Sequence, residues 1–271
     1  MPELPEVETT RRGISDHICN LPIIGVTVRQ PMLRWPVPDN LDGLLTGKTF
    51  LSVERRAKYL LLTTVEGTLI IHLGMSGSLR ILSSEIAPEK HDHVDIIFAN
   101  STVLRLRDPR RFGAVLWSPF VPARHALLDD LGIEPLLTPF NGRYLYDKAR
   151  KRKVDIKQFI MNSHIVVGVG NIYASEALFL SGIHPATSSH KISLQRMQKL
   201  AGAIKSVLRK AIKKGGTSLR DFTQSDGKPG YFKQSLNVYG RENQPCVNCG
   251  SRIKLIKQGQ RATYYCPRCQ K

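Results

Sequence analysis

The sequence predicts an α+β protein of several domains, in which a β-sandwich with an N-terminal helix precedes a helical domain and a small cysteine-rich β-hairpin. Three observations predict this fold class. Short strand-like runs fill residues 23–120, helix-like apolar periodicity fills residues 141–215, and four of the five cysteines lie in the last 26 residues. The 271 residues suffice for one large domain or two ordinary ones.

The chain opens with MPELPEVETT, and residues 5–18 are predicted to form a helix. Pro5 suits the first helical position, and Glu6 suits the positive end of the helix dipole. Pro2 and Glu3 precede this helix. Chain ends usually fray and have no function. A stiff, solvated terminus is therefore the simplest interpretation, and a terminus that takes part in chemistry is the alternative.

From about residue 23 to residue 120, short apolar or alternating runs are separated by Gly, Pro and Asp. Strands at this spacing are typical of a β-sandwich or a barrel-like domain. The predicted strands are Ile23–Val28, Thr49–Val53, Tyr59–Thr63, Thr68–Leu73, Val94–Phe98 and Thr102–Leu106.

The prolines of Ile133–Pro139 indicate a linker, and four helices are predicted after it. Gly182 with Pro185 ends the third helix, and the Gly215-Gly216 pair ends the fourth. The predicted helices are Tyr144–Arg152, Ile156–Met161, Ile172–Leu180 and Leu194–Lys213. We therefore expect a sandwich domain over 1–133, a linker over 134–150, a helical domain over 151–235 and a C-terminal module over 236–271.

The charge of the chain points to a polyanionic partner. Lys and Arg number 40 against 22 Asp and Glu, which leaves a net charge of +18 and a pI near 10.0. Nucleic acid is the first candidate and an anionic membrane surface the second. No apolar run approaches the roughly 20 residues that span a bilayer, and no basic and then apolar segment opens the chain. We expect a cytoplasmic protein without a membrane partner, associated with the nucleoid through DNA.

The C-terminal cysteines have the spacing of a zinc site. In a reducing compartment, clustered cysteines are more often metal ligands than disulfides. Four thiolates give a closed tetrahedral site with no position for an activated water, so one structural Zn²⁺ is predicted, and two disulfides are the alternative. The fifth cysteine, Cys19, is predicted to be inert. The predicted ligands are Cys246, Cys249, Cys266 and Cys269.

Between the two cysteine pairs, Ile253–Lys257 and Ala262–Tyr265 are predicted strands joined by a turn that contains Gly259. Several Lys and Arg side chains make this hairpin basic. It is either a solvated hairpin or a finger that reaches into a nucleic-acid groove with Arg261 at its tip.

A glycine turn, Val166–Asn171, precedes the helix that begins near Ile172. Such a turn presents backbone N–H groups to an anion. A dinucleotide fingerprint requires a third glycine where Tyr173 stands, so contact with a nucleic-acid phosphate is favoured over a nucleotide cofactor. The basic run Lys148–Lys153 is either a solvated face or an addition to this phosphate-binding surface.

Four separated features occur together: MPELPEVE at the start, RRAKY at residues 55–59, GVGNIY at residues 168–173, and the four-cysteine hairpin. With them the chain resembles the formamidopyrimidine-DNA glycosylase (MutM-type) family over essentially its whole length. The resemblance implies excision of oxidised purines, such as 8-oxoguanine and formamidopyrimidines, from double-stranded DNA, followed by β,δ-elimination at the abasic site. It also implies a helix–two-turn–helix motif in the helical domain, a zinc finger, and a monomer.

The resemblance also implies catalytic roles. In the family the initiator Met is removed and the new N-terminal proline, here Pro2, is the nucleophile. Glu3 would be the general acid/base, and Lys58 would contact a phosphate and donate a proton, although a solvated strand lysine is the alternative. Arg261 would grip phosphate and assist δ-elimination. Glu6 would either tune Glu3 or serve only the first turn of the helix.

DNA contacts follow from the same resemblance. Void-filling residues replace the flipped base, and Arg110 would face the orphaned cytosine. From the residues alone, Met75 and Phe112 would be core residues. The loop 217–232 would cover the everted base. A metal site at His91-Asp-His93 lacks a third ligand, so His91 is assigned a phosphate contact and His93 a structural role. The implied DNA-binding residues are His91, Arg110, Lys151, Asn171, Met75 and Phe112.

Two alternatives remain at this point. One is an endonuclease VIII-like glycosylase for oxidised pyrimidines, although the Glu3-Leu-Pro-Glu6 start and the long loop after Gly216 favour the purine branch. The other is a zinc-finger DNA-binding protein without catalysis. This protein would explain the charge and the cysteines, but not the organised N-terminus.

Overall fold

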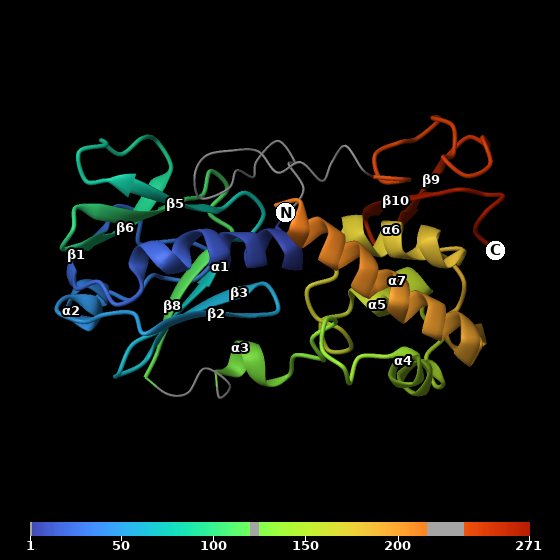
Figure 1. The fold of residues 1–271 in the computed structure, drawn as a ribbon, viewed down its shortest axis with the longest axis horizontal. Helices are drawn as coiled ribbons and strands as arrows, with labels where there is room; N and C mark the ends of the chain where they lie inside the picture. Colours follow the sequence, from blue (N-terminus) through green and yellow to red (C-terminus); the bar gives the residue numbers. More distant parts are fainter. Residues whose placement is uncertain (1, 120–124, 216–235) are drawn as a thin grey trace. The chain divides into compact units, whose positions relative to one another are not determined.

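Two sets of elements make up the structure, a computed structural model that describes residues 2–119, 125–215 and 236–271. Contacts divide these residues into two units, one built mainly from residues 2–129 and one from residues 130–213 with 236–271. Figure 1 labels the elements along the chain. None of the helices in these described ranges combines the length and the apolar character that a bilayer span needs.

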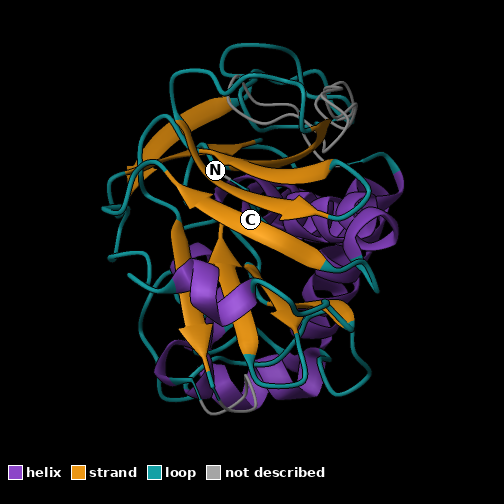
Figure 2. Ribbon diagram, turned by 90° about the vertical axis from the view of Figure 1, so that its left-hand side faces the viewer, coloured by secondary structure: helices purple, strands orange, loops and turns teal. Residues whose placement is uncertain are grey.

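The first unit contains two antiparallel sheets of four strands, which Figure 2 shows as two layers. One sheet has the order β1-β6-β7-β5 and the other the order β2-β3-β4-β8. The elements are α1 (Leu4–Ile18), β1 (Ile23–Val28), α2 (Leu41–Leu45), β2 (Ser52–Arg56), β3 (Tyr59–Thr63), β4 (Thr68–His72), β5 (Ser78–Ser83), β6 (Asp92–Phe98), β7 (Thr102–Arg107), β8 (Ala114–Ser118) and α3 (Ala126–Asp129).

Helix α1 shares the core of this sandwich. Val7, Ile14 and Ile18 lie on one helical face and are fully buried, because positions seven and eleven apart point the same way. They pack with alternating side chains of both sheets, such as Leu60 of β3 and Ile96 of β6. Figure 1 shows α1 running beside both layers. The core therefore fixes the helix that directly follows Pro2 and Glu3, two of the predicted catalytic residues.

The second unit is helical and ends in the β-hairpin. Helix α6 is buried from Ile172 to Phe179 because it contacts α5, α7 and β10. Helix α7 has one apolar face, with Met197, Leu200 and Ile204 at helical spacing. The elements are α4 (Gly142–Ala149), α5 (Ile156–Met161), α6 (Asn171–Ser181), the 3-10 helix η2 (Ser189–Lys191), α7 (Leu194–Lys213), β9 (Lys254–Gln258) and β10 (Arg261–Tyr265).

The predicted fold class is confirmed. Several element limits differ from those predicted, and β5 and β8 were not predicted. Two of the differences have a clear cause. The strand expected over Thr49–Val53 begins at Ser52, because Thr49 and Phe50 form isolated bridges to residues before β1 instead. The first predicted helix of the second unit begins at Gly142, where the Asn141 side chain accepts the Tyr144 N–H and caps it. The domain limits at 133, 150 and 235 stay a prediction.

Candidate functional site

The N-terminus is held in place rather than frayed. Pro2 and Glu3 are buried, so the interpretation as a solvated end is wrong. Glu3 caps α1 through a reciprocal capping box, in which its N–H donates to Glu6 Oε2 at 2.9 Å. Glu6 therefore helps to cap the first turn of α1, and its predicted tuning of Glu3 stays a prediction.

Lys58 lies in the two-residue turn between β2 and β3, not within a strand. Ala57, before it, has a φ of +56°, a strained value for a side chain with a Cβ. Arg55 braces this turn, since its Nη1 donates to the Ala57 carbonyl at 2.9 Å and its Nε to Glu8 Oε2 at 3.2 Å. Glu8 belongs to α1, so one ion pair ties the helix after Pro2 to the Lys58 turn.

The Glu8 carboxylate is stabilised in its charged form. Burial alone would raise the pKa of Glu8, but hydrogen bonds from Arg11 and Arg12, with the charges of Arg11 and Arg55, outweigh it and lower the pKa. A charged Glu8 keeps the contact with Arg55 at neutral pH.

A surface pocket of about 390 Å³ lies in the same unit, lined by Arg34, His72, Gly74, Met75 and Phe112. Phe112 is 46% exposed, so the expectation from the residues alone that it lies in the core is wrong. The two turns that carry Met75 and Phe112 touch. A Cβ on Gly74, whose φ is +62°, would lie 2.4 Å from the Phe112 carbonyl carbon. Arg110 is exposed, and its guanidinium lies 4.9 Å from the centre of the Phe112 ring.

His72 is a residue for which the sequence suggested no role. Its Nδ1 accepts the Gly74 N–H at 3.0 Å, so the neutral ring carries its proton on Nε2. Burial, with the charges of Lys58 and Arg34, lowers the pKa of His72 from 6.5 to about 4. His72 therefore offers the pocket a neutral N–H donor at physiological pH.

We expect the His72 imidazole to lower the free energy of unfolding as the pH falls. The unfolded chain protonates this imidazole below pH 6.5, but the folded chain does so only near pH 4, so stability is lost as pH falls through that window. Between pH 7 and pH 5, the free energy of unfolding should fall less in His72→Gln than in the wild type, because glutamine does not titrate. The difference should be at most roughly 2 kcal/mol, since solvent screens a partly exposed ring. Urea unfolding of both proteins at each pH measures it, and parallel losses would contradict the shifted pKa.

Among the described residues, His91 and His93 do not form a metal site with a third potential ligand. His91 has a φ of +79°, and its carbonyl accepts the Asp108 N–H at 3.0 Å. His93 is buried with Nε2 2.8 Å from the Asp108 carbonyl oxygen, in keeping with a structural role. Over the described part of the chain, the one cluster of three or more potential metal ligands is the cysteine group.

In the second unit, Asn171 lies at the start of α6 and joins it to the hairpin. Its Oδ1 accepts from Lys157 Nζ at 2.5 Å, and its Nδ2 donates to the Ala262 carbonyl at 3.0 Å. Lys157, on α5, is 1% exposed and also donates to Thr263 Oγ1 at 2.6 Å. The sequence suggested no role for Lys157, because its partners in β10, Ala262 and Thr263, lie more than a hundred residues away.

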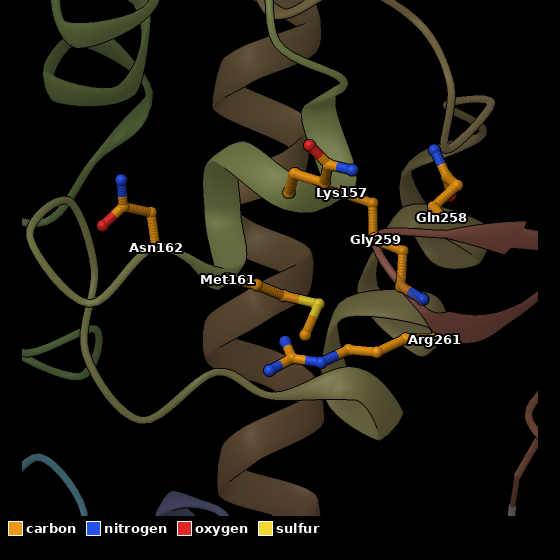
Figure 3. Close-up of a pocket in the computed structure, with 7 residues that line it drawn as sticks. Lys157, Met161, Asn162, Gln258, Gly259 and Arg261 are labelled. Atoms are coloured by element: carbon orange, nitrogen blue, oxygen red, sulfur yellow. The ribbon is translucent and has the colours of Figure 1, made fainter.

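Arg261 is the exposed first residue of β10, beside the turn Gly259-Gln260, where both φ values are positive. This is the predicted hairpin turn, in a form that suits glycine. Arg261 lines a pocket of about 120 Å³ with residues of α5 and the hairpin, and Figure 3 shows its side chain beneath Met161. Lys151 lies apart from this pocket's lining, exposed just after α4.

The four predicted zinc ligands come together. All four Sγ atoms lie within 4.8 Å of one another, with 3.9 Å between Cys246 and Cys269 and 3.5 Å between Cys249 and Cys266. A tetrahedron with metal–sulfur bonds of about 2.3 Å has edges of about 3.8 Å, whereas a disulfide needs about 2.05 Å. The cluster fits a tetrahedral metal ion and does not fit two disulfides.

Glu176, on α6, anchors the segment that leads into the hairpin. It is 1% exposed, and its carboxylate accepts the backbone N–H groups of Asn237, Val238 and Tyr239 at 2.9, 2.9 and 3.0 Å. The Asn237 side chain also donates to it at 2.8 Å. No local pattern indicates this contact, since the partners are about sixty residues apart.

Glu176→Gln is expected to lower the free energy of unfolding by about 2–4 kcal/mol, because the amide group replaces an acceptor with a donor that faces buried N–H groups. Thermal or urea unfolding measures the change. Glu66→Gln is the matched control, since that side chain is 66% exposed and should cost less than about 0.5 kcal/mol. Equal effects of the two substitutions would contradict the anchoring role.

Three family models match the chain. They are the formamidopyrimidine-DNA glycosylase N-terminal domain at residues 1–115, the formamidopyrimidine-DNA glycosylase H2TH domain at 131–223, and a zinc finger found in FPG and IleRS at 243–271. Together they cover most of the described structure.

Relatives of known identity match over full length. The formamidopyrimidine-DNA glycosylase of Syntrophotalea carbinolica is 58% identical over 271 residues, and that of Escherichia coli (strain K12 / DH10B) is 56% identical, each with 100% of both chains covered. A crystal structure of a Lactococcus lactis FPG mutant with DNA containing Fapy-dG has a TM-score of 0.93 at 35% identity, with 100% of both chains covered. Another, of L. lactis Fpg with abasic-site DNA, has a TM-score of 0.92 at 35% identity and 99% coverage. On these matches, the chain belongs to the formamidopyrimidine-DNA glycosylase family.

Proposed function

We propose that the chain is a bifunctional DNA glycosylase and AP lyase of base excision repair. It removes oxidised purines such as 8-oxoguanine and formamidopyrimidines from duplex DNA and nicks the abasic strand by β,δ-elimination. Besides family membership, the observation that carries the proposal is the N-terminus, where Pro2 is followed by a buried Glu3 that caps α1. A fixed terminus that places Pro2 and Glu3 beside each other supports a catalytic role, which a DNA-binding protein without catalysis does not require.

The Pro2 amine suits nucleophilic attack. An α-amine has a pKa of about 7.7–8.0 against about 10.4 for lysine, so more of it is unprotonated near neutral pH. Its nitrogen attacks C1′ of the deoxyribose as the base leaves. The C1′–O4′ bond then breaks, which opens the sugar ring and leaves an iminium, the furthest stage that a secondary amine can reach. The iminium accepts the electron pair released when a C2′ proton is removed, and the 3′ phosphate then departs from C3′ as the C2′=C3′ double bond forms. Covalent capture thus divides one difficult reaction into easier steps.

Other residues would act on protons and phosphates. Glu3 protonates the ring oxygen of the sugar and later returns protons as general acid/base. Lys58, tied to α1 through Arg55 and Glu8, contacts the phosphate at the lesion and donates a proton during β-elimination. Arg261 grips phosphate from the hairpin tip and assists δ-elimination.

Residues around the pocket lined by Met75 and Phe112 would occupy the space that the flipped-out base leaves in the duplex. Met75 and Phe112 fill the void, and Arg110 faces the orphaned cytosine. The exposure of Phe112 and Arg110 supports this assignment. His91, Lys151 and Asn171 contact phosphates. The loop 217–232, assigned to cover the everted base, lies outside the described residues.

The metal is one structural Zn²⁺ held by the four cysteines, which supplies folding energy to the hairpin and no reaction step. The DNA partner is supported by the net charge of +18 and by the DNA in the related crystal structures. We also propose that the protein acts as a cytoplasmic monomer on the nucleoid.

Borohydride trapping tests the function. Protein incubated with 8-oxoguanine duplex and borohydride should form a covalent adduct, and a duplex with thymine glycol should trap far less. Preference for thymine glycol would favour the endonuclease VIII-like alternative. Salt-sensitive DNA binding, with neither an adduct nor a nick on abasic DNA, would favour the alternative of a DNA-binding protein without catalysis.

A further inference from the structure

Asp108 is a buried acidic residue that the proposed mechanism does not use. It follows β7 directly, in the sequence Asp108-Pro-Arg-Arg-Phe-Gly113, and it is 0% exposed. A carboxylate buried to this extent must be satisfied by hydrogen-bond donors, and its donors come both from its own turn and from the turn that carries Ser76, 32 positions away.

The side chain of Asp108 joins two turns. Its Oδ1 accepts the Ser76 hydroxyl at 2.7 Å, and its Oδ2 accepts the Gly113 N–H at 2.7 Å. The Arg110 N–H lies 3.3 Å from both Oδ1 and Ser76 Oγ, so the three residues form one closed set of bonds.

The main chain of Asp108 adds a third turn. Its N–H donates to the His91 carbonyl at 3.0 Å, and its carbonyl oxygen lies 2.8 Å from His93 Nε2. The same carbonyl accepts the Arg111 N–H at 3.1 Å, where Arg111 has a φ of +56°. Asp108 therefore fixes a backbone conformation that a side chain with a Cβ rarely adopts.

The positions beside these partners are the predicted DNA contacts. Ser76 follows Met75, Gly113 follows Phe112, and His91 makes its own contact with Asp108. We infer that Asp108 is a positioning residue that holds the Met75, Arg110–Phe112 and His91 turns as one rigid group, so that the side chains inserted into the duplex and the phosphate contact of His91 keep one geometry. This inference rests on the proposed function, because it assumes that Met75, Arg110 and Phe112 enter the duplex at the flipped base.

A carboxylate suits this position, since it accepts several donors at once and offers none. Alanine at 108 would leave the Gly113 N–H and the Ser76 hydroxyl without this partner. Asparagine retains the shape and keeps an oxygen for Gly113, while its amide N–H₂ can donate to Ser76 Oγ. We therefore expect Asp108→Asn to restore most of what Asp108→Ala removes, and Ser76→Ala, which removes only one arm, to have a smaller effect than Asp108→Ala.

The test compares two substrates. Excision of 8-oxoguanine from a duplex needs the inserted side chains, whereas Schiff-base formation on a single-stranded abasic oligonucleotide needs only the N-terminal chemistry. A displacement of about 1 Å at a positioning site can cost a factor of about a hundred. Asp108→Ala should lower kcat/KM on the duplex about 100-fold and single-stranded trapping less than about 2-fold, and Ser76→Ala should lower the duplex value about 5-fold.

A spectroscopic signal reports insertion itself. With 2-aminopurine opposite the lesion, wild-type protein should raise the fluorescence on binding, and Asp108→Ala should bind without that rise. Equal loss on both substrates, as from a misfolded protein, or full duplex activity in Asp108→Ala would overturn the inference. If the wild type traps on neither substrate, the proposed function itself fails, so the two failures are distinct.

Discussion

An N-terminal extension that covers the Pro2 nitrogen is expected to lower borohydride trapping on abasic DNA by more than about a hundredfold, because an amide nitrogen cannot form an iminium. The structure makes this a sharp test. Glu3 is fixed by the capping box with Glu6, and α1 is buried against both sheets, so an extension leaves the remaining site in place. The loss should therefore appear in the chemistry and not in the fold.

A cleavable tag provides the matched control. The tagged protein should lose trapping and nicking but keep its affinity for DNA, and removal of the tag to leave Pro2 as the first residue should restore both activities. Intact mass spectrometry on untagged protein establishes whether Met1 has been removed. Full lyase activity with the extension still attached would refute the Pro2 assignment and move the search to a lysine.

Much of the fold could be predicted because local signals agreed with tertiary structure. The limits of β1, β3, α5 and α7 match the predicted residues, since the apolar pattern stops at polar or turn-forming residues there, such as Pro22 before β1 and Asn162 after α5. Strand β5 was not among those predicted, although Leu79, Arg80 and Ile81 alternate. The start of the strand predicted at Thr49 was wrong because of a tertiary contact: Thr49 and Phe50 pair with the segment before β1.

Candidate site residues could be predicted only where a motif indicates them. The spacing of the four cysteines predicts their cluster, which the structure contains, whereas Pro2 and Glu3 are candidates from the resemblance alone. His72, Asp108 and Glu176 carry no local signal, because burial distinguishes His72, and burial with partners far away in the chain distinguishes Asp108 and Glu176. The Ser76–Asp108 bond spans 32 positions and the Glu176–Val238 bond spans 62. Periodicity over a window of a dozen residues does not detect such pairs.

Cys266→Ser is expected to have the second large effect, loss of the metal and of the folded hairpin. Cys266 is 0% exposed and shares a small apolar cluster with Phe179, Val238 and Ile253. So few buried side chains do not stabilise the hairpin by themselves, so its folding depends on metal binding. Zinc content should fall from one ion per chain to near zero, and affinity for lesion DNA should fall at least about 100-fold, or about 3 kcal/mol.

Cys19→Ser is the control for this substitution, because Cys19 lies in the sandwich unit and outside the metal cluster. It should keep the zinc ion and the DNA affinity. Limited proteolysis locates the damage: in Cys266→Ser cleavage should begin within residues 236–271, while the sandwich unit with its core of two sheets stays resistant. A Cys266→Ser protein that retains its zinc ion would show that three thiolates suffice. A Cys266→Ser protein that loses zinc but keeps full affinity for DNA would show that Arg261 is not needed to hold DNA. That result would contradict the proposed role of the hairpin.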